Sequence, residues 1–346
     1  MALSKEKSTM RTLSKHVALL LAALAIALGG LTFIAPQHAH AGSISDPVLL
    51  VHGFNLSSTQ NCNTSTMFGD IESFFHSQGY TNTRSLGFYN GDSNCNAYLK
   101  QEKSHCTGWY DSGSNDGTVN EDIRHTSCLL AWYIWDTYTS HGVTVAVVGH
   151  SMGGILIRQA MNDTPYVAAF PPYLMVSDVV TAGTPHQGLP PGAAWTWETF
   201  QGCPGNCVEV AQMERTNGLM SNMNSTSFRG GFARDPQGYG GTDWTSMASN
   251  NDELLATCPS IGQESLGAPS GVSAGSECGL MPGGTHFVVY PGPSPSYCHG
   301  CYLTDEDTSW SADVSYSDTN GATWYTTTGF THSIQTMYYA VLYSSW

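Results

Sequence analysis

One stretch decides the fold: Val143-Thr144-Val145-Ala146-Val147-Val148-Gly149-His150-Ser151-Met152-Gly153-Gly154. Its first six residues are almost wholly apolar and mostly β-branched, which is typical of a strand buried on both faces of a parallel sheet. Helical spacing begins directly behind the glycines, over 155–161. The sequence therefore predicts a strand, a tight turn and a helix in immediate succession, with Ser151 at the turn.

Apolar runs alternate with helical patterns on both sides of this stretch. Further strands are expected over 48–51, 173–182, 244–248 and 286–290, and further helices over 68–78, 120–140 and 333–343. Strands that alternate with helices predict an α/β fold, in which helices cover both faces of a mostly parallel sheet. We expect one domain over 42–346, with the irregular segment 189–240 as a lid or insertion.

The first 41 residues have the pattern of a secretory signal peptide. Four basic residues precede an apolar run over 17–34, and the small-x-small sequence Ala39-His40-Ala41 follows Pro36. Cleavage after Ala41 would give an extracellular chain without a stable membrane anchor. The alternative is an anchor that stays, because the apolar run is close to the length of a spanning helix.

The charge of the chain argues against two classes of partner. The chain has 12 Lys and Arg against 27 Asp and Glu, a formal net charge of −15. Such a surface repels nucleic-acid phosphates and is not attracted to anionic lipid. We expect no nucleic-acid partner, and a monomer.

All ten cysteines follow the leader, and an even number in a secreted chain indicates disulfides. Pairing of nearest neighbours would join Cys62–Cys95, Cys106–Cys128, Cys203–Cys207, Cys258–Cys278 and Cys298–Cys301. Zinc is the competing interpretation for the last pair, because Cys298-His299-Gly300-Cys301 has the CxxC spacing.

Gly149-His150-Ser151-Met152-Gly153 matches G-x-S-x-G between a buried strand and a helix, the context of a nucleophile elbow. The serine occupies a strained turn, so the residues two positions away must be small. Ser151 is the predicted nucleophile. The backbone N–H groups of Met152 and Phe54 are the predicted oxyanion donors, because Phe54 lies in the loop after the strand at 48–51. His52, in the same loop, is expected to shape it.

Three motifs together resemble the secreted bacterial lipases and esterases of the α/β-hydrolase superfamily. They are Asp-Pro-Val-Leu-Leu-Val-His-Gly-Phe (46–54), Val-Gly-His-Ser-Met-Gly-Gly (148–154) and Gly-Thr-Pro-His-Gln-Gly (183–188). The stretch 244–252 is similar to the acid-bearing strand of those enzymes. The resemblance covers about residues 46–255, and it implies the α/β-hydrolase fold and the chain order serine, acid, histidine.

Asp252 lies where the resemblance places the acid, with Asp243 and Glu253 in reserve. For the base, His332-Ser333 precedes the last helix as in lipase-like chains, and His332 is our first choice. His299 is the alternative, because it lies in the loop after the strand 286–290. We expect His186 to shape its loop and His286 to pack within its strand.

These residues predict an extracellular carboxylic-ester hydrolase with a Ser-His-Asp triad and an acyl-enzyme intermediate. No metal or organic cofactor is required. The substrate would be a lipid, a short-chain ester or a polyester. The same triad is compatible with a secreted acyltransferase or a peptidase, and the same scaffold with a non-catalytic binding module.

Overall fold

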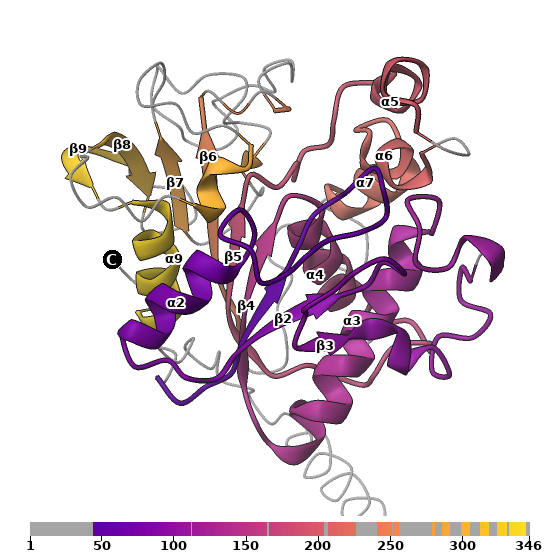
Figure 1. Cartoon of the computed structure of the whole chain (residues 1–346), viewed down its shortest axis with the longest axis horizontal. Helices are drawn as coiled ribbons and strands as arrows, with labels where there is room; N and C mark the ends of the chain where they lie inside the picture. The colour runs from indigo at the N-terminus through magenta and orange to yellow at the C-terminus, as the bar shows by residue number, and fades with distance from the viewer. Residues whose placement is uncertain are drawn as a thin grey trace, which may run out of the picture. The chain divides into compact units, whose positions relative to one another are not determined.

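The computed structural model describes residues 44–111, 113–164, 166–203, 207–225, 241–250, 252, 254–255, 279–280, 286–290, 299–304, 312–317, 324–330 and 332–343. Within these residues, nine strands form one sheet in the order β3-β2-β1-β4-β5-β6-β7-β8-β9 (Figure 1). From β3 to β7 every neighbouring pair is parallel, and β8 and β9 continue the sheet as antiparallel strands. The predicted α/β class with a mostly parallel sheet is confirmed.

The strands expected from apolar runs form within a few residues of their predicted bounds. The strands are β1 (Val48–Val51), β2 (Thr83–Gly87), β3 (Ala97–Tyr98), β4 (Val145–His150), β5 (Val176–Ala182), β6 (Asp243–Ser249), β7 (His286–Tyr290), β8 (Ala312–Ser317) and β9 (Trp324–Phe330). We did not predict β2, β3 or the β8–β9 hairpin, because none of them is a continuous apolar run.

Helices cover both faces of the sheet. The α-helices are α2 (Gly69–Ser77), α3 (Ile123–Thr137), α4 (Met152–Asp163), α5 (Ala193–Gln201), α6 (Val208–Met213), α7 (Gly218–Met223) and α9 (Ser333–Leu342). Short 3₁₀ turns include η1 (Leu99–Glu102), η2 (Gly113–Asn115), η3 (Thr139–His141) and η7 (Cys301–Leu303). Helices α2 and α9 lie together on one side, and α3 and α4 on the other (Figure 1).

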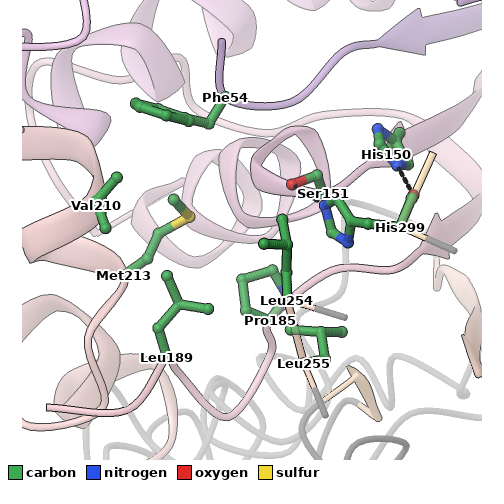
Figure 2. Close-up of a pocket in the computed structure, with 10 residues that line it drawn as sticks. All are labelled: Phe54, His150, Ser151, Pro185, Leu189, Val210, Met213, Leu254, Leu255 and His299. Atoms are coloured by element: carbon green, nitrogen blue, oxygen red, sulfur yellow. Dashed lines mark hydrogen bonds between the residues drawn. The ribbon is translucent and has the colours of Figure 1, made fainter. Parts of the chain in front are cut away.

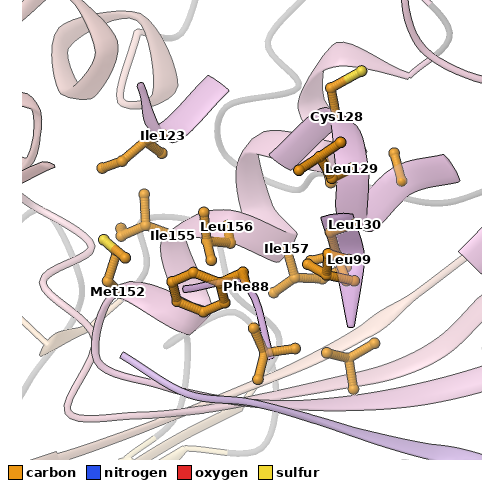
Figure 3. Packing of buried hydrophobic residues seen from close by; sticks show 14 of the residues in the cluster. Phe88, Leu99, Ile123, Cys128, Leu129, Leu130, Met152, Ile155, Leu156 and Ile157 are labelled. Carbon is orange, nitrogen blue, oxygen red and sulfur yellow. The ribbon is translucent and has the colours of Figure 1, made fainter. Parts of the chain in front are cut away.

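Alternation along the strands divides the core into two layers. In β1, Leu49 and Val51 join the cluster around α3 and α4, whereas Val48 and Leu50 join the cluster around α2 and α9. Figure 3 shows side chains of the first cluster, to which Ile155 and Leu156 belong. Burial on both faces explains why these strands are apolar at every position.

The start of α3 differs from the expectation. We expected the helix to begin at residue 120, but it begins at Ile123, and its N-cap is Asp122, whose Oδ1 accepts a hydrogen bond from Arg124 N at 2.8 Å. Asn120 instead accepts, through Oδ1, a hydrogen bond from Val208 N at 3.5 Å. The segment before α3 therefore forms a loop that contacts α6.

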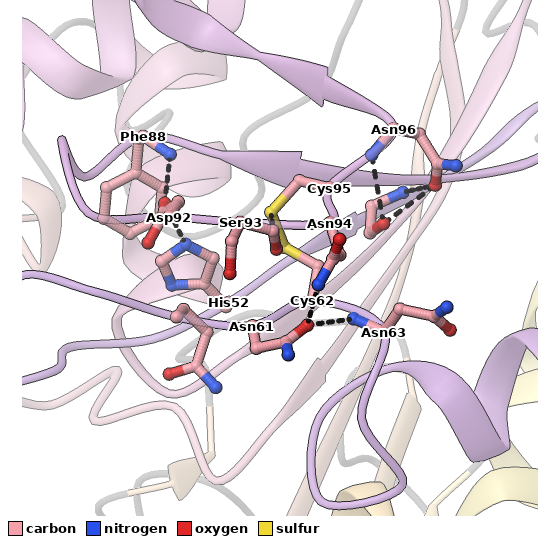
Figure 4. Close-up of a disulfide and its surroundings, with 12 residues drawn as sticks. His52, Asn61, Cys62, Asn63, Phe88, Asp92, Ser93, Asn94, Cys95 and Asn96 are labelled. Atoms are coloured by element: carbon pink, nitrogen blue, oxygen red, sulfur yellow. Dashed lines mark hydrogen bonds and ion pairs between the residues drawn. A yellow bond between two sulfur atoms is a disulfide. The ribbon is translucent and has the colours of Figure 1, made fainter.

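Three of the predicted disulfides are present: Cys62–Cys95, Cys106–Cys128 and Cys203–Cys207. Figure 4 shows the first of them, beside the loop that follows β2. Cys301 is also disulfide-bonded, which argues against a zinc thiolate at that position. Cys258, Cys278 and Cys298 lie outside the described residues.

Two further expectations fall wholly or partly outside the described residues, namely the leader over 1–41 and residues 226–240 of the insertion. In the described part of the chain, no helix is long and apolar enough to cross a membrane.

Candidate active site

Ser151 lies at the tight turn between β4 and α4, with φ 54° and ψ −127°. A positive φ is uncommon for a residue that carries a Cβ, and such strain persists only where the surroundings enforce it. Here β4 ends at His150 and α4 begins at Met152, so both neighbours of the serine are fixed. The side chain of Ser151 therefore stands at the carboxyl edge of the sheet.

The glycines around Ser151 are required by close backbone packing. A Cβ on Gly153 would lie 2.2 Å from Val51 O, and one on Gly149 would lie 2.7 Å from Gly154 N. A Cβ on Gly53, in the loop after β1, would lie 2.5 Å from the Cβ of Ser151. The turn and the loop after β1 thus contact each other without room for a methyl group.

Ser151, His299 and Asp252 form a continuous hydrogen-bonded line. His299 Nε2 lies 2.9 Å from Ser151 Oγ, and His299 Nδ1 lies 2.9 Å from Asp252 Oδ2 and 3.0 Å from Asp252 Oδ1. The carboxylate of Asp252 is fully buried, whereas the imidazole of His299 is 12% exposed. Ser151 follows β4, Asp252 follows β6 and His299 follows β7 in the chain. All three therefore lie at the edge of the sheet where these parallel strands have their carboxyl ends.

Backbone groups hold the carboxylate in place. Asp252 Oδ1 accepts hydrogen bonds from Leu254 N at 3.1 Å and from Leu255 N at 3.2 Å. These two bonds form a tight turn that fixes the orientation of the carboxylate independently of the histidine. A carboxylate that positions a base needs such a fixed orientation.

Of the two predicted bases, the structure brings the alternative, His299, to Ser151 Oγ, in place of our first choice, His332. His332 is the buried N-cap of α9, and its neighbour Ser333 donates from Oγ to Tyr302 O at 2.9 Å. The loop directly after β7 supplies His299, and the β8–β9 hairpin comes only afterwards.

Asp243, one of the two reserve acids, lies elsewhere. Asp243 forms an ion pair with His286 at 3.2 Å where β6 and β7 begin, away from the carboxyl edge. Asp178 is inside β5, where burial raises the pKa of its carboxyl to about 8. Glu253 lies outside the described residues. The buried His186 contacts Thr181 Oγ1 at 2.8 Å through Nε2, as expected of a residue that shapes its loop.

The loop that carries Phe54, one predicted oxyanion donor, is fixed by a second histidine–aspartate pair. His52 Nε2 lies 3.0 Å from Asp92 Oδ2, and His52 Nδ1 lies 2.9 Å from Gly53 O. Asp92 Oδ2 also accepts from Phe88 N at 2.7 Å (Figure 4) and from Tyr89 N at 2.8 Å. The other predicted donor, Met152 N–H, belongs to the first residue of α4, where the helix dipole favours negative charge.

Sequence reasoning missed the role of His150. Its Nε2 donates to the backbone carbonyl of His299 at 2.7 Å (Figure 2). Burial, together with the neighbouring imidazole of His299, lowers the pKa of His150 to about 3. His150 is therefore neutral and carries its proton on Nε2. The only signal in the sequence was its place beside Ser151, which gives no indication of a contact 149 residues away.

A pocket opens at Ser151 and His299, and its wall is apolar (Figure 2). The remaining lining residues are His150, Phe54, Pro185, Leu189, Val210, Met213, Leu254 and Leu255. Leu189 precedes α5, and Val210 and Met213 belong to α6, so the insertion supplies one side of the pocket. Arg158 of α4 holds this side in place, because its guanidinium donates to His186 O at 3.0 Å and to Met223 O at 2.9 Å.

Comparison with known proteins gives a partial family match and distant structural neighbours. A family model described as a PGAP1-like alpha/beta domain matches residues 114–252, which is less than half of the chain. No curated protein matches this chain. Mature lipase BlEst2 of Bacillus licheniformis is 16% identical, with a TM-score of 0.41, over 77% of this chain and 89% of that one.

Two further neighbours are longer chains, of which the match spans half or less. Aspergillus fumigatus lipase B is 15% identical, with a TM-score of 0.41, over 75% of this chain and 49% of that one. Phospholipase PlaB of Legionella pneumophila is 14% identical, with a TM-score of 0.39, over 60% of this chain and 40% of that one.

This chain has the α/β-hydrolase fold. The parallel sheet, the strand–serine–helix turn at its centre and the loops after β6 and β7 define that fold without help from the neighbours.

Proposed function

We propose that the chain is a serine hydrolase of carboxylic esters. One observation carries the proposal: the line Ser151 Oγ–His299 Nε2–His299 Nδ1–Asp252, with both contacts of the imidazole at hydrogen-bonding distance. In a line of this kind, the histidine accepts the proton of the serine hydroxyl as the serine oxygen attacks the substrate. The strained serine at the end of a parallel strand supports the same assignment.

The chemistry follows from these groups. Ser151 Oγ attacks the ester carbonyl and gives its proton to His299 Nε2, while Asp252 stabilises the imidazolium. The N–H groups of Met152 and Phe54 would hold the oxyanion. His299 then returns the proton to the leaving alkoxide, and an acyl-enzyme remains. Water, deprotonated by His299, attacks the acyl group and releases the acid and free Ser151.

The apolar wall of the pocket favours an ester with a hydrocarbon acyl group. Leu189, Val210 and Met213 face the space in front of Ser151 (Figure 2). Each buried methylene adds about 0.8 kcal/mol of binding free energy. We expect kcat/KM to rise several-fold per carbon from acetate until the pocket is filled. The segment 189–240, including α5 to α7, would then act as the partial cover of the site.

We further propose that the chain works outside the cell as a monomer. The disulfides support this location, because such bonds persist in oxidising compartments.

Two measurements test the function together. The first is hydrolysis of p-nitrophenyl esters from acetate to palmitate, by the wild type and by Ser151→Ala. The second is mass spectrometry after treatment with a fluorophosphonate, which adds covalently to activated serines. We expect turnover and a single adduct on Ser151 in the wild type, and neither in the variant. A folded wild type that gives the adduct but no ester turnover would favour an acyltransferase, and one that gives neither would favour a binding module.

A further inference from the structure

A second cluster of polar side chains, two of them buried, lies where the loop before α3 meets the first turn of that helix. Asp116, Glu121 and His125 each offer one ligand atom, and these atoms all lie within 4.8 Å of one another. The side chains of Glu121 and His125 are 3% and 0% exposed. Nothing in the proposed hydrolysis uses these residues.

The tautomer of His125 is set by the backbone. His125 Nδ1 lies 2.8 Å from Trp109 O, and a carbonyl oxygen only accepts, so Nδ1 carries the proton. Nε2 of a neutral ring is then a bare lone pair. A histidine that donates one ring N–H to a carbonyl and presents the other nitrogen is the usual arrangement of a metal ligand.

The lone pair of His125 faces a carboxylate oxygen instead of a donor. Nε2 lies 3.4 Å from Glu121 Oε1, and neither atom has a hydrogen-bond partner among the described residues. The other oxygen of this carboxylate, Oε2, accepts from Gly117 N at 2.6 Å, which fixes the direction of Oε1. Two buried acceptors that face each other need either a proton or a cation between them.

The separation of these two atoms fits a metal ion better than a proton. An N–H···O hydrogen bond is about 2.7–3.2 Å long. Ligands about 2.0–2.1 Å from a tetrahedral zinc ion are about 3.3–3.4 Å apart, which is the separation of Nε2 and Oε1. Lys103 does not fill this role, since within the described residues its ammonium forms an ion pair with Asp116 alone.

We propose that Asp116, Glu121 and His125 bind one first-row divalent cation, with Zn²⁺ as the best fit. An imidazole with two carboxylates suits such an ion better than Ca²⁺ or Mg²⁺, which take oxygen ligands. Water would complete the coordination. The site would be structural, since none of these three residues lines the pocket at Ser151.

Binding there would stabilise one side of the pocket. The loop that contains two of the ligands contacts α6 directly: Glu209 N donates to Val119 O at 3.2 Å, and Ile123 N donates to Gln212 Oε1 at 2.7 Å. Helix α6 carries the pocket residues Val210 and Met213. An ion that fixes the loop therefore also fixes the support of this helix.

The chain offers a matched control. Glu102, His105 and Asp136 form a second group with the same residue types. His105 is 37% exposed, however, and its Nε2 lies 3.0 Å from Asp136 Oδ2, an ordinary ion-pair distance. His105→Gln should leave metal binding unchanged, whereas His125→Gln should abolish it.

The test uses the full chain without a histidine tag, stripped with EDTA and reloaded with Zn²⁺. Mass spectrometry of the metal content and calorimetry should give one Zn²⁺ per chain. His125→Gln and Glu121→Gln should weaken binding at least ~100-fold, since loss of a ligand exceeds the 10–100-fold effect of its supporting groups. Saturating Zn²⁺ should raise the Tm of the wild type by a few degrees, and that of His125→Gln by none.

Co²⁺ provides a readout that does not depend on the stability of the variants. Tetrahedral coordination of Co²⁺ by the stripped wild type should give visible d–d absorption bands. Absence of these bands, together with no Zn²⁺ bound at micromolar concentration, would mean that a proton shared by Glu121 and His125 occupies the place, and the proposal would be wrong. Equal loss of binding in His105→Gln would also overturn it.

Discussion

Two histidine–aspartate pairs lie on either side of Ser151, and only one of them can take its proton. His299–Asp252 follows β7 and β6, and His52–Asp92 follows β1 and β2. The ring-to-carboxylate distances are 2.9 and 3.0 Å, and both carboxylates are buried. By residue type, distance and burial the pairs are nearly the same.

The remaining ring nitrogen separates them. In His299 it faces Ser151 Oγ at 2.9 Å, whereas in His52 it faces Gly53 O at 2.9 Å. Nε2 of His299 is placed to accept the proton of the Ser151 hydroxyl. Nδ1 of His52 instead faces a carbonyl oxygen of its own loop. A buried histidine beside a carboxylate therefore indicates a base only when its other nitrogen reaches a nucleophile.

The largest expected effect is that of His299. His299→Ala should lower kcat on a p-nitrophenyl ester by about 10⁴–10⁶-fold, because Ser151 then has no proton acceptor. His332→Ala should retain at least about a tenth of the activity, since His332 caps α9. Steady-state kinetics of both variants, with circular dichroism as a check of folding, decide between them. If His332→Ala were the inactive one, the geometric assignment of the base would be wrong.

The two aspartates should differ by about two orders of magnitude. Asp252→Asn should reduce kcat by about 10⁴-fold, because the amide no longer selects the tautomer in which Nε2 accepts the proton of Ser151. Asp92→Asn should reduce kcat by only about 10²-fold or less, through the loop that carries Phe54. Equal losses in both variants would remove the distinction between the two pairs.

How much of this site the sequence could predict depends on how many residues separate the two partners of each contact. Ser151, Met152 and the two glycines follow from local sterics, and a strand–turn–helix pattern reveals them. Asp252 follows from its place after a strand. The base does not, because three histidines follow Asp252 and the choice among them depends on where the β8–β9 hairpin is inserted. The hairpin was not predicted, because neither of its strands is a continuous apolar run.

The same limit applies to polar pairs. His52–Asp92 spans 40 residues and His150–His299 spans 149, and neither has a pattern of spacing. The disulfides were easier, because nearest-neighbour pairing was correct for Cys62–Cys95, Cys106–Cys128 and Cys203–Cys207. Local periodicity in the sequence predicts helices and strands. Contacts between loops can be predicted only when the order of the strands in the sheet is known.

A smaller effect is expected from the ring of His52 itself. His52 stacks on Phe88 with the ring centroids 4.0 Å apart, so His52→Phe keeps the packing and removes both polar contacts. The loss leaves Asp92 with its two backbone donors, Phe88 N and Tyr89 N. We expect kcat to fall about 10–30-fold with KM nearly unchanged, because an oxyanion donor acts mainly in the transition state. A rise in KM alone would instead indicate that the loop binds the ground-state substrate.

His150 gives the smallest effect and connects the pairs to pH. His150→Phe removes the donor to His299 O and should lower kcat about tenfold, whereas His150→Gln should restore part of the activity because its amide can donate. Since burial lowers the pKa of His150 to about 3, the ring stays neutral in the folded state well below pH 6. The variants should therefore leave the pH profile of kcat unchanged in shape, as expected of a residue that positions the base and does not exchange a proton.

Stability should respond to acid at the same residue. The unfolded chain takes up a proton at His150 near pH 6.5, and the folded chain resists it until about pH 3. The contribution of a neutral His150 is thus present above pH 6.5 and is lost as the pH falls toward 3, by an amount on the order of 1.4 kcal/mol per pH unit. Urea unfolding at pH 7 and pH 4 should show a smaller acid loss for His150→Phe than for the wild type. Equal losses would mean that His150 is protonated in the fold, and its proton could then no longer be assigned to Nε2 alone.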